Sequence, residues 1–495
     1  MNEKSLRNLS ITYLLLPNFI FFYNWVNGPI GLIGILLLLY LGIMDWRDNS
    51  FVKIKILGKR DHLVIASSAF FLTVLSGLTG LVFQNIDYWA HNVKFYELLH
   101  SPWPIRYPQD GPVISYYYGF YVMPILFAKL TGTIKELYIF TWAWVGLSFG
   151  VAWIYLALNK RIFFVWLVFF IGDLPRVIKS ILSIFSLSLY QFGDFGIELW
   201  SNFENLLWVP NQTIPTLIIG GMLVYVLIRG FNIELLVLPI ALSFWWAIFP
   251  AFVSGVIVGF LVVWKWVVAK FQLDWTRVIN QVFIPFLVCM PMLIFFFSHE
   301  KSAISGFAWE FTTKVSNVVS EYLVNIGVNV VLFVVSYIYF KSKQLPFLDP
   351  VPFFFIIILI LLFPIYRLGD ANDLLVRGMM PILIIVGIYL FYPLTMLTAQ
   401  KAFDLARNSG IVLILVVMLI FSSLFGITRI FRAITINRIT AKLSNSGVSF
   451  TPIPYNSYSI VHDVLKEKWS QDAADQYTGD DNSFYEKYIA PRSEN

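Results

Sequence analysis

The sequence predicts an all-α polytopic membrane protein with about thirteen transmembrane helices and further helices along the outer membrane face. Composition is the first observation: 58% of the 495 residues are hydrophobic and 13% are charged, which is too apolar for a chain whose surface faces water. Second, apolar runs of about 17 to 22 residues recur up to residue 428, and each can cross a hydrocarbon core of roughly 30 Å. Third, lysine and arginine collect in alternate loops, as expected of cytoplasmic segments.

The N-terminal segment predicts an uncleaved signal anchor with its N-terminus inside. Lys4 and Arg7 precede the first apolar run, and no small-residue cleavage site follows them. A helical hairpin over 9–26 and 28–44 then leads to the loop 45–61, which carries the strongest inside signal. The remaining spans are expected at 62–83, at 137–157, from residue 162 onward, and at 213–228, 233–249, 251–269, 281–297, 324–340, 351–366, 379–397 and 410–428.

The segment 113–131 is predicted to lie along the outer interface rather than to cross the membrane. A crossing would place Lys160 and Arg161 outside, whereas an interfacial segment keeps them inside and gives a consistent charge order. Pro124 also interrupts what would be a short span. Four tyrosines of this segment suit the headgroup region, namely Tyr116, Tyr117, Tyr118 and Tyr121.

The change in composition after residue 428 predicts two parts. Residues 1–428 form the polytopic transmembrane domain, and residues 429–495 form a polar C-terminal tail on the outer side. Three basic residues at the start of the tail, Arg429, Arg432 and Arg438, disagree with this charge order. The net charge of +6 is spread over many loops, so it indicates topology and no nucleic-acid partner. The outer loops are expected at 84–136, 173–212, 298–323 and 367–378.

The first outer loop holds the strongest candidate for chemistry. Asp87, His91 and Lys94 follow one another at i, i+4 and i+7, so they share one face of a helix. Trp89 and Val93 fall on the opposite face, which predicts an amphipathic helix at the outer surface. Asp87 would act as a general base or a metal ligand, with His91 and Lys94 near a phosphate. An ordinary solvated helix face is the structural alternative.

Two further outer loops present polar residues. Arg106 lies in a proline-rich segment that cannot form a helix, so it is either a substrate contact or part of a rigid connector. Asp173 opens the next loop. Asn211 and Gln212 stand at the mouth of a span, where their amides could bind sugar hydroxyls or cap the helix that follows.

The last outer loop leads from an acidic segment into an apolar span. Asp370, Asp373 and Arg377 fall at i, i+3 and i+7 on one helical face, with Arg377 near headgroup level. These residues would bind a substrate or a lipid phosphate. Alternatively, Asp373 and Arg377 form a purely structural pair, because an isolated charge at that depth is costly.

These features resemble the GT-C class of membrane glycosyltransferases over most of residues 1–428. The general likeness lies in acidic residues at the outer ends of spans, in an early outer loop that opens with Asp, and in basic groups near headgroup level. The chain is also similar to a bacterial group of such proteins in four motifs, DYWAHN at 87–92, YYYGFYVMPILFAKLTG at 116–132, WVPNQ at 208–212 and GDANDLLVR at 369–377.

The resemblance implies transfer of a sugar from a polyprenyl-phosphate-linked donor to a glycan, lipid or protein acceptor. The reaction would take place at the extracytoplasmic face of a bacterial plasma membrane, with Asp87 as the base. The leaving phosphate would be stabilised by Arg377, Lys94 or Arg106. A divalent metal is left open, with Asp87 and His91 as two candidate ligands. The sequence departs from the class in having no second acid close to Asp87, since the next one is Glu97.

Two other functions fit a chain with this many spans. One is a transporter or flippase of lipid-linked saccharides, which carries out no chemistry. The other is a polysaccharide polymerase or ligase, which is chemically related to the transferase and also faces outward. Ionisable residues are scarce within the predicted spans and the acids lie at the outer rim, which favours a reaction chamber over a path through the membrane.

Overall fold

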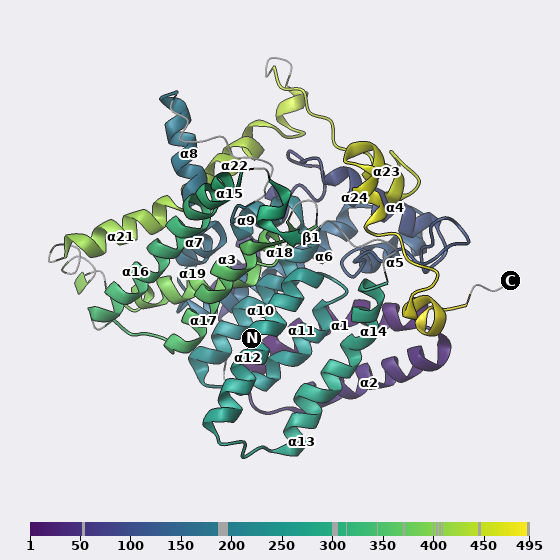
Figure 1. Cartoon of the computed structure of the whole chain (residues 1–495), viewed down its shortest axis with the longest axis horizontal. Helices are drawn as coiled ribbons and strands as arrows, with labels where there is room; N and C mark the ends of the chain where they lie inside the picture. Colours follow the sequence, from purple (N-terminus) through teal and green to yellow (C-terminus); the bar gives the residue numbers. More distant parts are fainter. Residues whose placement is uncertain are drawn as a thin grey trace.

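Eight helical segments of the described chain are long and apolar enough to cross a membrane (Figure 1). The computed structural model describes residues 1–492 except 52–54, 187–196, 299–304, 313, 344, 370–371, 399, 402–403, 405–406, 408 and 444–446. The eight segments are Gly28–Arg47, Glu136–Ala157, Pro210–Arg229, Ile248–Val268, Trp275–Phe296, Val315–Ser342, Asp373–Thr395 and Gly410–Thr435. These helices support an integral membrane protein, and the number of about thirteen spans stays a prediction.

The remaining elements are shorter helices and one pair of strands. The first part of the chain contains α1 (Glu3–Asn24), α2 (Gly28–Arg47), α3 (Lys59–Leu75), α4 (Tyr88–His100), α5 (Val122–Thr131), α6 (Glu136–Ala157), α7 (Ile162–Phe170), α8 (Leu174–Ile184), α9 (Asn202–Trp208), α10 (Pro210–Arg229), η1 (Ile233–Leu236), α11 (Val237–Ser243), α12 (Ile248–Val268), α13 (Trp275–Val278), η2 (Ile279–Phe283) and α14 (Ile284–Phe296).

The second part begins with a short strand. It contains β1 (Ser305–Phe307), η3 (Ala308–Phe311), α15 (Val315–Tyr322), η4 (Leu323–Gly327), α16 (Val328–Ser342), α17 (Pro350–Leu362), η5 (Phe363–Ile365), β2 (Tyr366–Leu368), α18 (Asp373–Val376), α19 (Met380–Thr395), α21 (Gly410–Phe421), α22 (Leu424–Thr435), η6 (Thr440–Lys442), α23 (Val461–Lys468), α24 (Gln471–Asp475) and η7 (Tyr485–Ile489). Strands β1 and β2 pair antiparallel, with Ser305 opposite Leu368.

Helix α10 lies at the centre of the fold and is buried on almost every side. It packs against α6 and α19. The contact with α6 is close because a glycine on each helix faces a large side chain: a Cβ at Gly150 would meet Leu217, and one at Gly221 would meet Trp153. Small residues at such positions let two apolar helices approach without a gap. The central place of α10 puts its first turn inside the protein.

The end of the hairpin formed by α1 and α2 is fixed by a buried ion pair. Arg7 donates from Nε and Nη2 to Oδ1 of Asp45, at 2.9 and 2.6 Å, and also to the carbonyl oxygen of Leu235. Both side chains are almost fully buried. Arg7 is therefore a packing residue as well as a topology signal, because removing either partner would leave a buried charge unpaired.

The structure corrects the prediction for segment 113–131. The helical part, α5, begins only at Val122 and is too short to span a bilayer. The four tyrosines that were expected among lipid headgroups are instead buried inside the protein, with exposed fractions of 5% or less. They are covered by α4, by α11 and α12 and by the tail, so their hydroxyls and rings are available to line an internal site.

The tail also differs from the prediction of a separate polar extension. It folds back onto the helical body, where Asn92 donates to the carbonyl oxygen of Ile453 at 2.6 Å and Ser115 donates its backbone N–H to the carbonyl oxygen of Tyr477 at 3.0 Å. Helix α23 lies against α4 (Figure 1). The tail therefore lies on the same side of the molecule as the segment 84–112.

The two faces of the membrane domain can be tested by labelling. We expect a membrane-impermeant maleimide to react in intact cells with a cysteine at Gln109 and not with one at Asn49, because the segment 84–112 faces outside and 45–61 faces inside. Both positions are exposed, so lack of reaction cannot arise from burial. The buried Cys289 is replaced by serine in both variants. Equal labelling of the two sites in intact cells contradicts this arrangement, and labelling of Asn49→Cys after permeabilisation is the positive control.

Candidate active site

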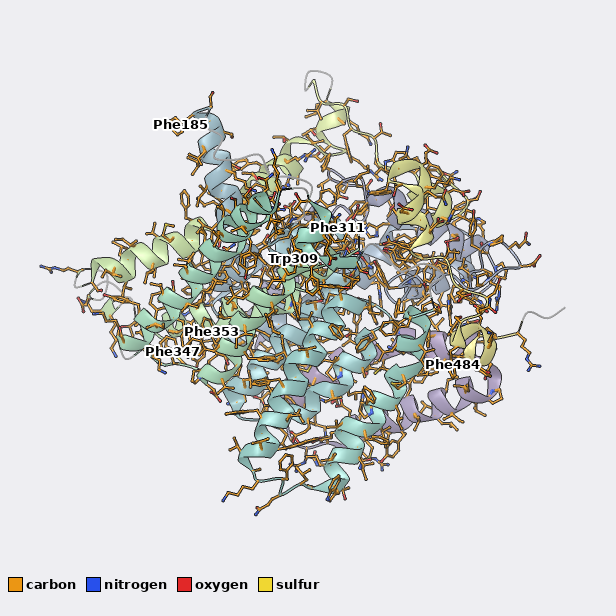
Figure 2. The ribbon with its side chains drawn as sticks, viewed as in Figure 1. Phe185, Trp309, Phe311, Phe347, Phe353 and Phe484 are labelled. Carbon is orange, nitrogen blue, oxygen red and sulfur yellow. The ribbon has the colours of Figure 1, made fainter. Side chains whose placement is uncertain are left out.

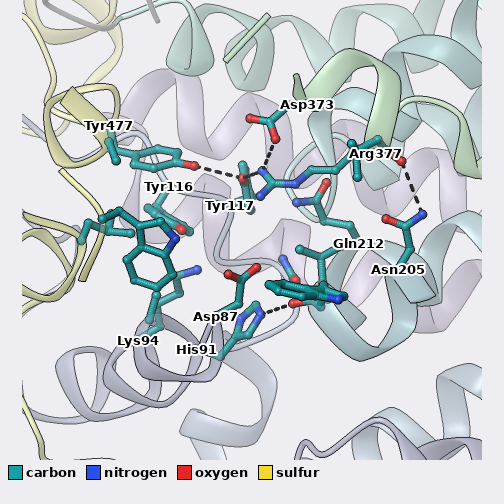
Figure 3. Close-up of a pocket in the computed structure, with 18 of the residues that line it drawn as sticks. Asp87, His91, Lys94, Tyr116, Tyr117, Asn205, Gln212, Asp373, Arg377 and Tyr477 are labelled. Carbon is teal, nitrogen blue, oxygen red and sulfur yellow. Dashed lines mark hydrogen bonds and ion pairs between the residues drawn. The ribbon is translucent and has the colours of Figure 1, made fainter. Parts of the chain in front are cut away.

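One cavity of about 200 Å³ collects most of the predicted site residues (Figure 3). Its walls come from α4, from α9 and α10, from α18, and from α23 and α24 of the tail. Segments that are far apart in the sequence therefore meet on one side of the protein. The predicted residues that line it are Asp87, His91, Lys94, Asn211, Gln212, Asp373 and Arg377.

Asp87 lies at the N-terminus of α4 but does not cap the helix. Its side chain forms no cap hydrogen bond, and no described residue donates a hydrogen bond to its carboxylate. Figure 3 shows the carboxylate pointing into the cavity. Burial raises the pKa of Asp87 to about 6, while the charges of Arg377 and Lys94 act in the opposite direction. Such a carboxylate is ionised at neutral pH and is a stronger base than an exposed aspartate.

His91 is held as a neutral side chain by two hydrogen bonds. Its Nε2 lies 2.8 Å from the carbonyl oxygen of Trp208, which can only accept, so Nε2 carries the proton. Its Nδ1 then accepts from the hydroxyl of Tyr121. Burial, together with the charge of Lys94, lowers the pKa of His91 to about 3. Both nitrogens are therefore engaged, which corrects the prediction that His91 offers a metal ligand beside Asp87.

The arrangement of other possible metal ligands agrees with that correction. In the part of the chain that the structure describes, no group of three or more His, Cys, Asp or Glu side chains is arranged to hold a metal ion. The donors that the cavity does offer are the Asp87 carboxylate, amide groups and tyrosine hydroxyls. These groups suit a hydroxylated organic ligand.

Lys94 places a buried amine against aromatic rings. Its side chain is 2% exposed, and Nζ lies 3.7 Å from the centre of the Tyr116 ring and 5.2 Å from that of Tyr121. Burial and the charge of Arg377 lower the pKa of Lys94 well below its usual value. Because a nearby negative charge favours the charged form of an amine, an anion bound in the cavity would strengthen the positive charge of Lys94.

Arg377 is the second cation of the cavity and is fixed in place by two contacts. Its Nη1 donates to the hydroxyl of Tyr117 at 2.9 Å and lies 3.1 Å from Oδ1 of Asp373. The hydroxyl of Tyr117 is also 3.3 Å from that of Tyr477, which comes from the tail (Figure 3). The predicted pairing of Asp373 with Arg377 is therefore present. The chain of contacts from Asp373 to Tyr477 forms one wall of the cavity.

The opposite wall carries amide groups without hydrogen-bond partners. Asn211 and Gln212 are completely buried in the first turn of α10, and all four of their side-chain polar atoms lack a partner among the described residues. Val209 is the N-terminal cap of α10, so these two residues do not cap it and that alternative is wrong. Asn205 adds a third amide, whose oxygen is also unpartnered. Buried amides of this kind are costly unless a ligand or water satisfies them.

A second, more apolar cavity lies behind the wall formed by Tyr117, Asp373 and Tyr477. Its volume is about 380 Å³, and those three residues line both cavities. Its other side chains are mainly hydrocarbon, from the start of α12, the end of α14 and β2: Ile248, Phe249, Phe296, Phe297 and Leu368. A polar chamber and an apolar chamber thus meet at a shared wall that includes the partner of Arg377.

The tail forms the roof of the polar cavity. Its lining residues are Leu465, Trp469, Ala473, Gln476 and Tyr477. Because α23 covers α4, the face of α4 that was predicted to lie on the membrane surface is buried by protein instead; Val93, for example, is completely buried. The prediction that Asp87, His91 and Lys94 share one face is confirmed, since all three line the cavity.

Glu97 joins this roof to α4 from outside the cavity. It is completely buried, and its Oε2 accepts from the hydroxyl of Tyr118 at 3.4 Å. Burial raises the pKa of Glu97 to about 8, although the backbone N–H of Val461 and the hydroxyl of Tyr118 act in the opposite direction. At neutral pH this glutamate is therefore mainly protonated, and it packs against the first residue of α23 as a neutral group.

The raised pKa of Glu97 predicts how stability depends on pH. In the unfolded chain Glu97 ionises near its ordinary pKa, whereas the folded chain keeps the proton up to about pH 8, so wild-type stability falls by up to roughly 1.4 kcal/mol per pH unit between these values. We expect Glu97→Gln to reduce this fall, measured as the thermal midpoint in detergent at about pH 5 and about pH 8. The exposed Glu467→Gln is the control. The prediction fails if Glu97→Gln and wild type lose the same number of degrees.

Three predicted site residues do not line the cavity. Arg106 donates to Glu486 at 3.3 Å and to the carbonyl oxygens of Gly111 and Pro491, so it holds the end of the tail. Asp173 is buried beside Arg176 at 3.7 Å and accepts from the backbone N–H of Ser201, which connects α8 to α9. Burial raises the pKa of Asp173 to about 7, against the charge of Arg176. Asp370 lies outside the described residues.

The sequence analysis missed the aromatic lining and the tail. Trp200, Trp208, Tyr116 and Tyr117 contribute rings to the cavity, and the tail contributes the five residues given above. One signal was present: Val461, Val464 and Leu465 follow the i, i+3, i+4 pattern of an amphipathic helix within a polar segment. That pattern indicates a helix that must cover an apolar surface, although it does not say which one.

No protein-family model, curated protein or solved structure matches this chain. The functional argument therefore rests on the chemistry and geometry of the cavity and on the motifs of the sequence.

Proposed function

We propose that this chain is a membrane glycosyltransferase of the GT-C type, which transfers a sugar from a polyprenyl-phosphate-linked donor to an acceptor hydroxyl at the extracytoplasmic face. One observation carries the proposal. A carboxylate without a hydrogen-bond partner, Asp87, shares a single buried cavity with two cations, Lys94 and Arg377, and with the unpartnered amides of Asn211 and Gln212. This set combines a base, phosphate-binding groups and donors and acceptors for sugar hydroxyls.

Each group has a role in the proposed reaction. Asp87 accepts the proton of the acceptor hydroxyl while the acceptor oxygen forms a bond to the anomeric carbon of the donor sugar. The bond between that carbon and the phosphate oxygen breaks, and its electron pair leaves with the lipid phosphate. Arg377 and Lys94 stabilise the negative charge of the departing phosphate. The amides of Asn211 and Gln212 orient the sugar, which keeps the reacting atoms aligned.

The second cavity supports a lipid-linked donor. Its hydrocarbon lining suits the chain of a polyprenyl carrier, and it shares Tyr117 and Asp373 with the polar cavity. Arg377 bonds to both of these residues, so a phosphate held there would have its sugar on one side and its lipid on the other. The proposal includes the predicted architecture of about thirteen spans, in which α1, α3 and the shorter apolar helices join the eight long ones.

The test is a profile of lipid-linked sugars and surface glycans in a strain that lacks the gene. We expect the lipid-phosphate sugar to accumulate at the outer face and one glycan substituent to disappear. Wild-type protein restores the substituent, and the Asp87→Asn protein at equal abundance does not. Accumulation of the donor at the inner face alone would instead indicate a flippase, and loss of long polymers with intact single substitutions would indicate a polymerase.

A further inference from the structure

A separate cationic surface lies on α22, which belongs to the candidate span Gly410–Thr435. This helix and the turn after it carry Arg429, Arg432 and Arg438, the three residues that disagree with the charge order of the loops. Two of them have carboxylate partners. Arg429 donates to both oxygens of Glu204, at 2.9 and 2.7 Å, and Arg438 donates to both oxygens of Glu136, at 3.2 and 2.6 Å.

Arg432 differs from the other two. It is exposed, and it forms no ion pair or hydrogen bond with any residue that the structure describes. Its guanidinium lies over the ring of Phe83, 3.5 Å from the ring centre. Together with Arg429 and Asn85 it lines a shallow hollow beside Trp208. An arginine held against a ring in this way is oriented, and its N–H donors remain free for an anion.

Exposed hydrocarbon surrounds this arginine. Phe431 and Ile434 are 63% and 60% exposed on the same helix, and Ile427 adds a third side chain one turn earlier. Helix α8, which contacts α22, ends in the exposed side chain of Phe185, which projects from the body of the protein (Figure 2). One unpaired cation flanked by apolar side chains, on a helix that continues a candidate span, matches the boundary between headgroups and acyl chains.

We propose that Arg432 binds the phosphodiester headgroup of an anionic phospholipid, whose acyl chains lie along Ile427, Phe431 and Ile434. Charge complementarity selects an anionic headgroup, because the carboxylate of Glu204 in the same hollow is already occupied by Arg429. Arginine is suited to phosphate oxygens through its paired N–H donors. The site is distinct from the sugar-transfer cavity, and its occupant is a lipid of the bilayer that is not consumed.

The test uses the purified full chain in nanodiscs of phosphatidylcholine with a minor fraction of phosphatidylglycerol, without any sugar donor. Native mass spectrometry then gives the ratio of the two lipids that stay bound. We expect wild type to retain phosphatidylglycerol preferentially, and Arg432→Gln to lower this preference roughly fivefold. Lys442→Gln is the matched control, since it removes an equally exposed charge after the same helix. Phe431→Ser should reduce retention of both lipids without abolishing the preference.

The outcomes separate the possible occupants. An unchanged preference in Arg432→Gln, or an equal loss in Lys442→Gln, overturns the proposal. Displacement of phosphatidylglycerol by soluble glycerol phosphate also overturns it, because the site would then recognise a free phosphate. Since the measurement requires no glycosyl transfer, its failure leaves the proposed function untouched, and failure of the transfer assay leaves this lipid site untouched.

Discussion

Replacing Asp87 with asparagine should lower sugar transfer by roughly a hundredfold or more while donor binding survives. Asparagine keeps the shape of the side chain but cannot accept the proton of the acceptor hydroxyl. The change should not disturb folding, because the wild-type carboxylate forms no cap hydrogen bond and no described residue donates to it. The measurement is transfer of a lipid-linked sugar by purified protein, normalised to the folded fraction, with binding of the donor measured separately.

The pH dependence of transfer gives a second readout of the same group. Because burial raises the pKa of Asp87 to about 6, wild-type turnover should fall as the pH drops through that value and the carboxylate takes up a proton. The residual activity of Asp87→Asn should lack this step. Asp110→Asn, an exposed acid of the same outer segment, is the matched control and should keep both the rate and the profile. Near-normal turnover of folded Asp87→Asn would remove Asp87 from the mechanism.

Replacing Arg377 with glutamine should weaken binding of the donor by about ten- to a hundredfold, the range expected for loss of a hydrogen bond to a charged group. The reason is that Arg377 is the arginine fixed in the wall between the polar and apolar chambers, by Tyr117 and Asp373. Asp373→Asn should weaken binding as well, because it releases the guanidinium from its position. Affinity is measured with a polyprenyl phosphate that carries no sugar, so the readout reports the phosphate alone.

Removal of Arg377 leaves the buried carboxylate of Asp373 without its cation, which by itself can lower stability. The double variant Asp373→Asn with Arg377→Gln is therefore essential, since it removes both charges together. Arg106→Gln is the control: it was an equal candidate in the sequence, but it lies outside the cavity on Glu486. Wild-type affinity in both the Asp373→Asn and the Arg377→Gln proteins would show that the pair is purely structural.

The parts of this protein that depend on local patterns could be read from the sequence. Hydropathy runs gave the membrane class, because a lipid solvent requires long apolar helices whatever their neighbours are. Helical periodicity placed Asp87, His91 and Lys94 on one face and paired Asp373 with Arg377, since residues three, four or seven apart share a face of any helix. These five side chains all line the cavity.

Tertiary structure alone decided what surrounds those side chains. The burial of Asn211 and Gln212 follows from the central position of α10, and both nitrogens of His91 are engaged by groups from other segments. The tail reaches α4 across 361 positions of the chain, through the hydrogen bond from Asn92 to Ile453. Such contacts depend on which apolar and polar surfaces fit together after the helices have formed, and short-range periodicity carries no record of that fit.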